Sequence, residues 1–408
     1  MRTSMFTVRD WAGNSTMKHS TLPDAELRAL LTLRLVPGIG PRLLAAILER
    51  FGTATAALGA TPSQLATVPH LRAEVVDKLS HAIGSAEVDA ELALMSRYAA
   101  SVLARGTPEY PASMLPFPGM PPVLYLRGDY RPTDERAVGI VGSRDATSQG
   151  LKMAKRLAEG LARAGFTVIS GLARGIDGAA HQGALDAGGR TLAVMANGLA
   201  TIYPPEHDRM ADAMIARGGL ISEATMGQKP QPGLFPARNR LISALSRAVV
   251  LVEAREKSGA LHTAVHAAEQ GRPVLAMPGS LDNPLAAGCH ELIRKGAILC
   301  RGLDDVLEAV ADPLVLKPRQ GSLFDVPAVE DEKKEANVVP PPIAPVPPPQ
   351  LDGASLAIWN ALADGALFID ELGSRSELSP AELNRTLFQM EMGRTVRKMP
   401  GNRIERRG

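Results

Sequence analysis

Cysteine and long apolar runs are scarce in this sequence. Cys289 and Cys300 are its only two cysteines, which excludes a disulfide framework and a cysteine-rich metal site and suits a reducing cytoplasm. No run approaches the roughly 18–20 consecutive apolar residues that span a bilayer. The first twenty residues contain no apolar segment of the kind that a secretory signal requires. We therefore expect a cytoplasmic protein.

Net charge is also small. The chain has 45 basic and 43 acidic side chains, which gives +2 and, taken over the whole chain, no indication of nucleic-acid binding. Yet Lys229–Arg247 carries +4 and Arg394–Gly408 carries +5, which leaves −7 for the rest. Near-neutrality is therefore a cancellation between basic segments and an acidic remainder. Any nucleic-acid binding is expected on defined surfaces.

Composition indicates a folded protein of several domains. Apolar residues make up 45% and charged residues 22% of the 408 residues, so most of the chain can bury a core, and the length fits two or three domains at about 150 residues each. Residues 317–350 include nine prolines around an acidic middle, which is typical of an extended linker. We predict a disordered N-terminus at 1–22, a helical domain at 23–104, an α/β domain at 105–316, a Pro-rich linker at 317–350 and a winged-helix domain at 351–408.

The segment VPGIGPRLL lies within the helical domain. Pro41 at a first helical position, apolar Leu44 and Ile47 at helical spacing, and Gly52 as a stop predict a helix from Pro41. The Gly-x-Gly turn before it resembles a helix-hairpin-helix, whose amides face phosphate. A purely structural helical module explains the segment equally well, and both interpretations stay open.

Short apolar runs alternate with helical segments between Val123 and Ala311. The runs, most of them closed by glycine, are VLYL, AVGIVG, FTVISG, TLAVMANG, GLISE, AVVLVEA and PVLAMPG. Buried parallel strands have this continuous apolar character, and their alternation with helices predicts βαβ units in one sheet. The predicted fold class is therefore α/β, with a doubly wound, mostly parallel sheet.

The last domain combines a capped helix with a basic hairpin. A capping box at Ser379-Pro380-Ala381-Glu382 opens a helix, and the following TVRKMPGNRIERR turns around Gly401-Asn402. These elements predict a winged helix-turn-helix. The basic cluster suggests nucleic acid, and a solubilising tail or a partner-binding surface is an equally good interpretation.

Glycine-rich turns follow three of the predicted strands. Their sequences are GIVGSRDATSQG, SGLARGIDGAAHQGAL and MPGSLDNPLAAGCHELI. Ligands of parallel sheets lie at the carboxyl ends of strands, where helix N-termini offer amides. None of the three turns matches a P-loop or a correctly placed GxGxxG, which argues against nucleoside triphosphate hydrolysis. One such turn more often only allows strand and helix to pack closely, but three of them, two with an arginine, favour an anion-binding groove.

The most informative segment is KPQPGLFPARNRLISALSR. Phe235 lies in a Pro/Gly-rich loop that leads into a helix, close to Arg238 and Arg240. Phe235 could plug the core and the arginines could be solvated. However, cations at a helix N-terminus oppose the helix dipole unless an anion offsets them. A basic track with an aromatic platform is how proteins hold single-stranded nucleic acid without sequence preference, and we favour that interpretation.

Other polar residues are weaker candidates for chemistry. Asp177 and His181 lie four residues apart, as a catalytic base and the residue that orients it could. We favour a structural interpretation, in which Asp177 caps the helix and His181 holds a loop in place. Glu223 and Glu253 each end a strand and form a carboxylate pair only if the fold brings them together. Ser258-Gly259 opens another helix, where anion binding and plain capping are equally expected. The chain contains no HExxH, CxxC or nucleophile elbow.

Three blocks of this sequence resemble the signature blocks of the DNA-processing protein A family, also called DprA or Smf. They are SGLARGIDGAAHQGAL, ISEATMGQKPQPGLFPARNRLISALSRAVVLVEA and MPGSLDNPLAAGCHELIRKGA. The resemblance covers about Pro108–Ala311 and extends to the helical domain, which is similar to the family's sterile-alpha-motif-like domain, and to the winged helix. It implies an extended Rossmann-like fold, a cytoplasmic homodimer, and no catalytic activity or cofactor. It also implies binding of single-stranded DNA, which is protected and handed to the RecA recombinase during natural transformation.

The residues expected to contact DNA combine this resemblance with the loop and charge arguments above. They are Gly142, Ser143, Arg144, Ser170, Gly171, Arg174, Gly175, Lys229, Phe235, Arg238, Asn239, Arg240, Ser258 and Gly259.

The alternative is a Rossmann-like enzyme that hydrolyses the glycosyl bond of a nucleoside monophosphate. Such hydrolases carry a double-glycine, glycine-threonine loop with a nearby glutamate. This chain has only MPGS at the comparable place, which favours the DNA-binding interpretation.

Overall fold

The computed structural model describes residues 21–311 except 83, and residues 351, 353–363, 365, 367–376, 378–393, 395–399 and 403–406. The chain divides into two compact units, Met1–Arg319 and Gln320–Gly408, and each is described by itself. The predicted N-terminal segment up to residue 20 and the predicted linker at 317–350 lie outside the described residues.

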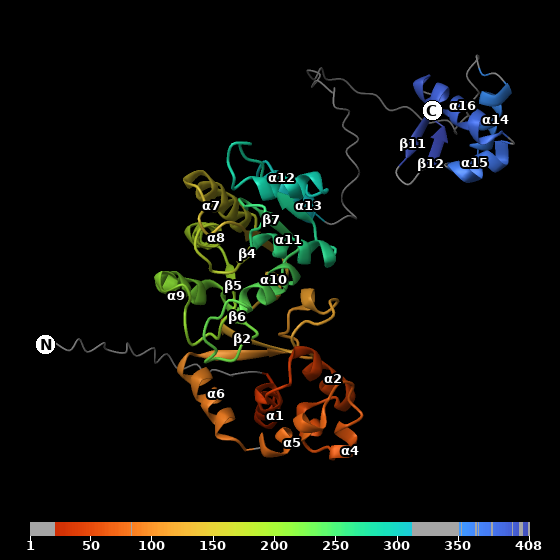
Figure 1. The fold of residues 1–408 in the computed structure, drawn as a ribbon. Helices are drawn as coiled ribbons and strands as arrows, with labels where there is room; N and C mark the ends of the chain where they lie inside the picture. The colour runs from red at the N-terminus through yellow and green to blue at the C-terminus, as the bar shows by residue number, and fades with distance from the viewer. Residues whose placement is uncertain are drawn as a thin grey trace, which may run out of the picture. The chain divides into compact units, whose positions relative to one another are not determined.

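The first unit begins with a helical module (Figure 1). Its helices are α1 (Asp24–Leu35), α2 (Pro41–Phe51), α3 (Ala54–Leu58), α4 (Pro62–Leu65), α5 (Ala73–Ala82) and α6 (Ala86–Arg97). The expected features of α2 are confirmed, because Pro41 is its first residue, Leu44 and Ile47 are buried, and Gly52 ends it at a φ of 78°.

A nine-stranded sheet follows within the described residues, in the order β1-β2-β6-β5-β4-β3-β7-β8-β9. The strands are β1 (Ala100–Ala104), β2 (Val123–Gly128), β3 (Ala137–Val141), β4 (Thr167–Ser170), β5 (Thr191–Met195), β6 (Gly219–Ser222), β7 (Ala248–Leu251), β8 (Val274–Ala276) and β9 (Ile298–Leu299). The strands from β3 to β9 pair in parallel, and β1 and β2 are antiparallel additions at one edge. The predicted doubly wound, mostly parallel sheet is confirmed.

Helices cover both faces of the sheet (Figure 1). They are α7 (Ser148–Arg163), α8 (Ile176–Asp186), α9 (Asp208–Arg217), α10 (Leu234–Ala244), α11 (Ala260–Glu269), α12 (Ala287–Arg294) and α13 (Leu303–Val310). Alternate residues of β7 serve the two faces, since Val249 and Leu251 join the core under α10 and α11, whereas Val250 joins the core under α7 and α8. The strand order reverses between β3 and β7, which is where a doubly wound sheet binds ligands.

The boundary predicted at residue 105 needs a correction. Strand β1 pairs with β2 along its whole length, so the sheet begins at Ala100, inside the segment assigned to the helical domain. The helical module also shares a core with the sheet, in which Leu31 and Leu44 belong to the same buried cluster as Tyr125 and Leu220. The module and the sheet are therefore one packed body.

The second unit contains α14 (Gly353–Ala361), β10 (Leu367–Phe368), α15 (Ile369–Ser376), α16 (Pro380–Met392), β11 (Val396–Met399) and β12 (Arg403–Arg406). The predicted capping box is present, with the Ser379 Oγ accepting from the Glu382 amide and the Glu382 carboxylate accepting from the Ser379 amide. Strands β11 and β12 pair antiparallel as a hairpin. The turn at Gly401-Asn402, Arg394 and Arg407 lie outside the described residues.

No helix in the described part of the chain is long and apolar enough to cross a membrane.

Candidate nucleic-acid interface

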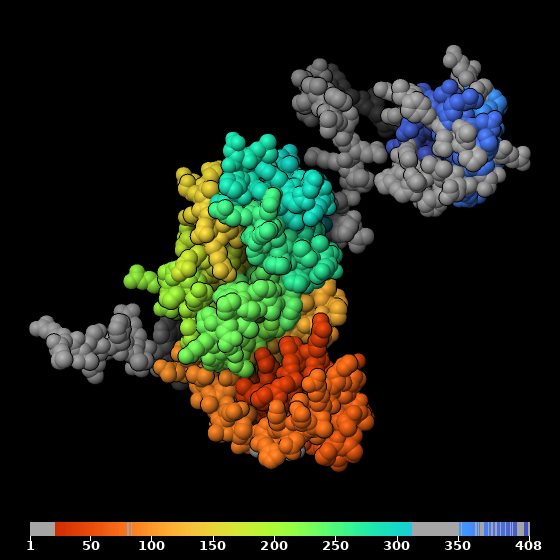
Figure 2. All heavy atoms as spheres, in the orientation of Figure 1, coloured from red at the N-terminus to blue at the C-terminus, as the bar shows by residue number. Residues whose placement is uncertain are grey.

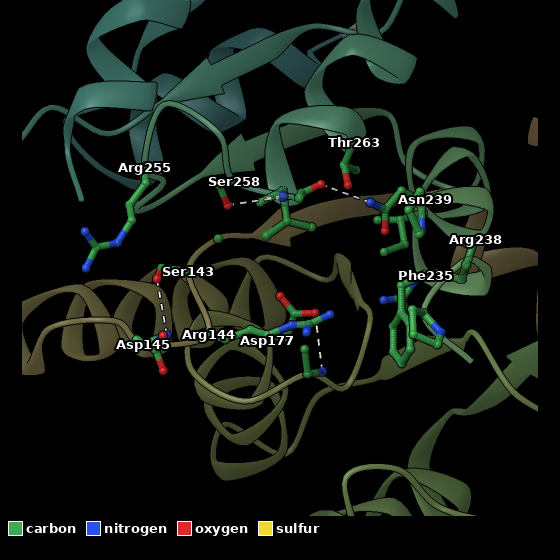
Figure 3. Close-up of a pocket in the computed structure, with 18 of the residues that line it drawn as sticks. Ser143, Arg144, Asp145, Asp177, Phe235, Arg238, Asn239, Arg255, Ser258 and Thr263 are labelled. Atoms are coloured by element: carbon green, nitrogen blue, oxygen red, sulfur yellow. Dashed lines mark hydrogen bonds between the residues drawn. The ribbon is translucent and has the colours of Figure 1, made fainter. Parts of the chain in front are cut away.

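A cleft of about 690 Å³ opens at the carboxyl ends of β3 and β7, where the strand order reverses. Figure 3 shows Arg255, Ser258, Asn239 and Thr263 along one side of the cleft and Ser143, Arg144, Asp145 and Asp177 along the other, with Phe235 at one end. The loop before α10 completes the wall with Pro230, Gln231 and Pro232. The cleft thus lies where parallel-sheet proteins hold ligands.

The turn after β3 is fixed by the loop after β7. The Ser143 amide donates to the Glu253 carbonyl oxygen (2.6 Å), and the Thr147 amide and hydroxyl donate to the Glu253 carboxylate (2.8 and 2.7 Å). Gly175, at a φ of 73°, precedes α8 and lies against this turn, and a Cβ there would lie 2.2 Å from the Ser143 oxygen. Glycine is required at 175 because the two backbones touch.

Arg238 is the most unusual charge in the cleft. Only 5% of the residue is exposed, and its Nη1 donates to the carbonyl oxygens of Gly171 (2.8 Å) and Val194. Its Nε has no hydrogen-bond partner among the described residues. Burial lowers the pKa of Arg238 to about 10, although the Asp177 carboxylate acts in the opposite direction. A buried guanidinium at the edge of a cleft, with one buried donor left unpaired, is suited to an anion.

An aromatic pair and an arginine meet at one end of the cleft. The rings of Tyr203 and Phe235 lie edge to face with centroids 5.9 Å apart. The guanidinium of Arg144 lies over the Phe235 ring at 5.2 Å, within the range of a cation–π contact. Tyr203 is 38% exposed, so aromatic surface remains open to a ligand.

Asp177 and His181 both have structural roles, but only His181 has the one that the sequence favoured. The Asp177 carboxylate accepts from the amides of Gly171 (3.0 Å) and Ala173 (3.4 Å), and His181 Nε2 accepts from the Leu172 amide (3.3 Å). Both side chains are buried, and burial raises the pKa of Asp177 and lowers that of His181 to about 3. They hold the loop after β4, so Asp177 ties a loop and does not cap its own helix, which begins after Gly175.

Glu223 and Glu253 do not form a carboxylate pair. Three strands separate β6 from β7, about 19 Å at the usual strand spacing. Glu223 forms an ion pair with Arg240 (2.5 Å), and Glu253 accepts from Thr147.

The structure gathers part of the predicted set in the cleft. The predicted residues that line it are Gly142, Ser143, Arg144, Phe235, Arg238, Asn239, Ser258 and Gly259. Asn239 donates to the Gly259 carbonyl oxygen (3.1 Å), and Ser258 Oγ accepts from the Ala260 amide (3.3 Å).

The other predicted residues lie outside the lining. Ser170 is buried and donates to the Ile140 carbonyl oxygen (2.6 Å). Gly171 leaves room for Arg238, because a Cβ there would lie 2.3 Å from its Nη2. Arg174 forms an exposed ion pair with Glu206, and Arg240 is neutralised by Glu223. Of the remaining two, Lys229 is exposed in the loop after β6, and Gly175 is packed against the Ser143 backbone just before α8.

The cleft also contains residues that the sequence reasoning missed. Arg255 and Lys257, both exposed, follow β7, and Tyr203 follows β5. The rule that ligands lie at strand ends could have identified the first two, because they follow a predicted strand directly.

Among the described residues, no group of three or more histidine, cysteine, aspartate or glutamate side chains could hold a metal ion. The two cysteines are buried, and burial raises the pKa of Cys289 to about 12 and that of Cys300 to about 11.

Comparisons with known proteins agree with this architecture. The family model described as DNA recombination-mediator protein A matches residues 101–311, and the DprA winged helix domain matches residues 342–402. Protein Smf of Synechocystis is 33% identical over 385 residues, which cover 91% of this chain and 96% of that protein. DNA processing protein DprA of Bacillus subtilis is 38% identical over 261 residues, 62% of this chain and 88% of that protein.

A solved structure has the same fold. The X-ray structure of DNA processing protein A from Streptococcus pneumoniae superposes with a TM-score of 0.62 at 31% identity, and the match covers 70% of this chain and 98% of that chain. The resemblance seen in the sequence blocks is thereby confirmed, and the chain belongs to the DprA/Smf family of DNA recombination-mediator proteins.

Proposed function

We propose that this protein binds single-stranded DNA in the cleft between β3 and β7, without catalysing a reaction on it. In this proposal the bound strand is protected and then passed to the RecA recombinase during natural transformation. The protein acts in the cytoplasm as a homodimer.

The observation that carries the proposal is Arg238. A guanidinium that is 5% exposed, bonded to backbone carbonyls and left with an unpaired Nε forms no direct ion pair among the described residues, although the buried Asp177 carboxylate acts on it electrostatically. A phosphate in the cleft would have to reach this buried Nε, and it would then supply both a negative charge and the missing acceptor. Charge-assisted bonds of this kind are about twice as strong as neutral ones.

The cleft adds further cations at its rim. Arg144, Arg255 and Lys257 are exposed and form no ion pair within the described residues. With Arg238 they outnumber the two acids, Asp145 and Asp177, that line the same space. We assign phosphate contacts to these four cations. Arg174 and Arg240 already have carboxylate partners, so we give them a supporting role.

The aromatic pair supplies the contact that distinguishes an unpaired strand from a duplex. Stacking on Phe235 and Tyr203 requires a base that is free of its complement, and it contributes about 1–3 kcal/mol per base. Duplex DNA keeps its bases stacked inside, so only its phosphates could reach the cleft.

The names of the relatives support a role in DNA metabolism. Those from B. subtilis and S. pneumoniae are called DNA processing proteins, and the matching family model is described as a recombination mediator. Transfer to RecA and dimerisation are carried over from the family resemblance.

A salt titration tests the DNA proposal. Fluorescence anisotropy with labelled oligo-dT and with a duplex of equal length should give tighter binding of the single strand, with an affinity that falls as salt rises. Tight binding of a mononucleotide without binding of the oligonucleotide would favour the glycosyl hydrolase instead. Light scattering tests the dimer, and faster assembly of RecA on DNA pre-bound by this protein tests the transfer.

A further inference from the structure

The helical module holds the segment that carries one wall of the cleft. Residues 223–233 run from β6 to α10, include Pro230–Pro232 of the cleft lining, and end two residues before Phe235. In Figure 2 the green surface of this part of the chain meets the red and orange surface of the helical module. Charged side chains of the helical module form the hydrogen bonds to this segment.

Glu91 is the first of these contacts. It lies on α6 and is only 5% exposed, and its Oε1 accepts a hydrogen bond from the Met226 amide at 2.8 Å. The fully buried Tyr125 ring lies close by, and burial together with the Glu91 carboxylate raises the pKa of Tyr125. Because a buried carboxylate is costly unless it is bonded, this side chain fixes the segment strongly at Met226.

Arg34 is the second contact. From α1 its Nη2 donates to the Glu223 carbonyl oxygen at 2.8 Å, and the Glu223 side chain pairs with Arg240 on α10. The start of the segment is therefore held from the module and from the α/β domain at once.

The fixed segment in turn holds the loop that carries Tyr203. The Ala200 amide donates to the Met226 oxygen (3.0 Å), and the Gly198 amide donates to the Gln228 oxygen (2.9 Å). The two backbones are so close that a Cβ on Gly198 would lie 2.0 Å from the Thr225 oxygen. Met226 is thus bonded to Glu91 through its amide and to the Tyr203 loop through its carbonyl.

We propose that Glu91 is a positioning residue for the aromatic pair Tyr203 and Phe235. It acts through Met226, which lies in the segment that leads to Phe235 and is hydrogen-bonded to the loop that carries Tyr203. The helical module then contributes to binding of single-stranded DNA without touching the strand. The effect on DNA rests on the function proposed above, whereas the effect on the two loops does not.

Hydrogen exchange of the free, full-length protein tests the positioning directly. Glu91→Ala should speed exchange in segments 197–204 and 223–235, while Glu91→Gln, which keeps the acceptor oxygen, should restore the wild-type rates. Glu87→Ala is the matched control, because Glu87 is an exposed acid on the same helix. Arg34→Met, which removes the second anchor, provides the same comparison if Glu91→Ala does not fold. Unchanged exchange in both segments would overturn the proposal.

A double-mutant cycle tests the consequence for DNA. Glu91→Ala should weaken oligo-dT binding about fivefold, which is the low end of the roughly 5- to 150-fold that one stacked base contributes. In a background that lacks both rings, Tyr203→Ala with Phe235→Ala, the same substitution should have almost no effect, since the rings it positions are gone. Equal losses in both backgrounds would show a general structural role and refute the proposal. If the wild-type protein binds no single strand, the proposed function fails, and hydrogen exchange still decides the role of Glu91.

Discussion

Replacing Arg238 by methionine separates phosphate binding from folding. Methionine keeps an unbranched side chain of similar length in the buried space next to Gly171 and removes the guanidinium. The Gly171 and Val194 oxygens lose their donor, at a cost of about 1–3 kcal/mol each. Removing a buried cation that forms no direct ion pair among the described residues offsets part of this cost, although the buried Asp177 carboxylate loses its electrostatic partner. We expect a folded protein whose unfolding free energy changes by roughly 2 kcal/mol or less.

The effect of Arg238→Met on DNA should be much larger than on folding. A charge-assisted hydrogen bond to phosphate contributes about 1.5–3 kcal/mol, which corresponds to an affinity loss of about 10- to 150-fold. One lost phosphate contact should also make the slope of log K against log salt shallower by about 0.7. Arg163→Met, at the exposed end of α7, removes the same charge far from the cleft and is the control.

The assay is fluorescence anisotropy with labelled oligo-dT over a range of KCl concentrations, combined with thermal unfolding of each variant. Wild-type affinity and slope in a folded Arg238→Met protein would refute the assignment of Arg238 to phosphate.

Two further predictions concern stability. Gly175→Ala should lower the unfolding free energy by about 2–4 kcal/mol, because the new Cβ would lie 2.2 Å from a backbone oxygen. The control is Gly165→Ala, which has a similar φ of 78° but lies in open space and should lower it by only about 1–2 kcal/mol. Equal losses in urea titrations would contradict the steric argument. Burial lowers the pKa of His181 to about 3, from about 6.5 in the unfolded chain. The unfolding free energy should therefore fall as the pH drops below about 6.5, by up to roughly 1.4 kcal/mol per pH unit. The raised pKa of Asp177 opposes part of this fall, because it favours the folded state as the pH drops. Urea midpoints from pH 7 to 5 should therefore fall less steeply in His181→Gln than in His262→Gln, the control at an exposed histidine of α11. Parallel curves would contradict the assignment.

Strands β2 to β8 were predictable because each is a largely buried run that shows in the sequence as continuous apolar residues. Strand β1 escaped because Ala100–Ala104 follows α6 after only two residues and has the sequence ASVLA, whose alanines and serine do not favour a strand. Strand β9 escaped because it has only two residues, both exposed. In each case pairing with a neighbouring strand, and not local sequence, fixes the extended conformation.

The helix positions of Arg238 and Arg240 explain why one faces the cleft and the other does not. At about 100° per residue, Arg238 lies about 60° from Phe235 around α10, whereas Arg240 lies about 140° away. Helical geometry therefore separates the two arginines once α10 is known to begin at Leu234. The burial of Arg238 and the pairing of Arg240 with Glu223 depend on tertiary packing, which composition and spacing do not encode.

Internal pairing decides which arginines of this nearly neutral chain are available to DNA. Arg240 and Arg174 already have carboxylate partners. The cleft cations without an ion pair among the described residues are Arg144, Arg238, Arg255 and Lys257. Four phosphate contacts would give a salt slope of about −3 from the cleft on single strands. Removing any one of the four should make the slope shallower by about 0.7, whereas Arg240→Ala should change it far less. If Arg240→Ala also made the slope shallower by about 0.7, DNA would have to break the ion pair between Arg240 and Glu223. The ion pairs of the free protein would then not predict which cations bind DNA.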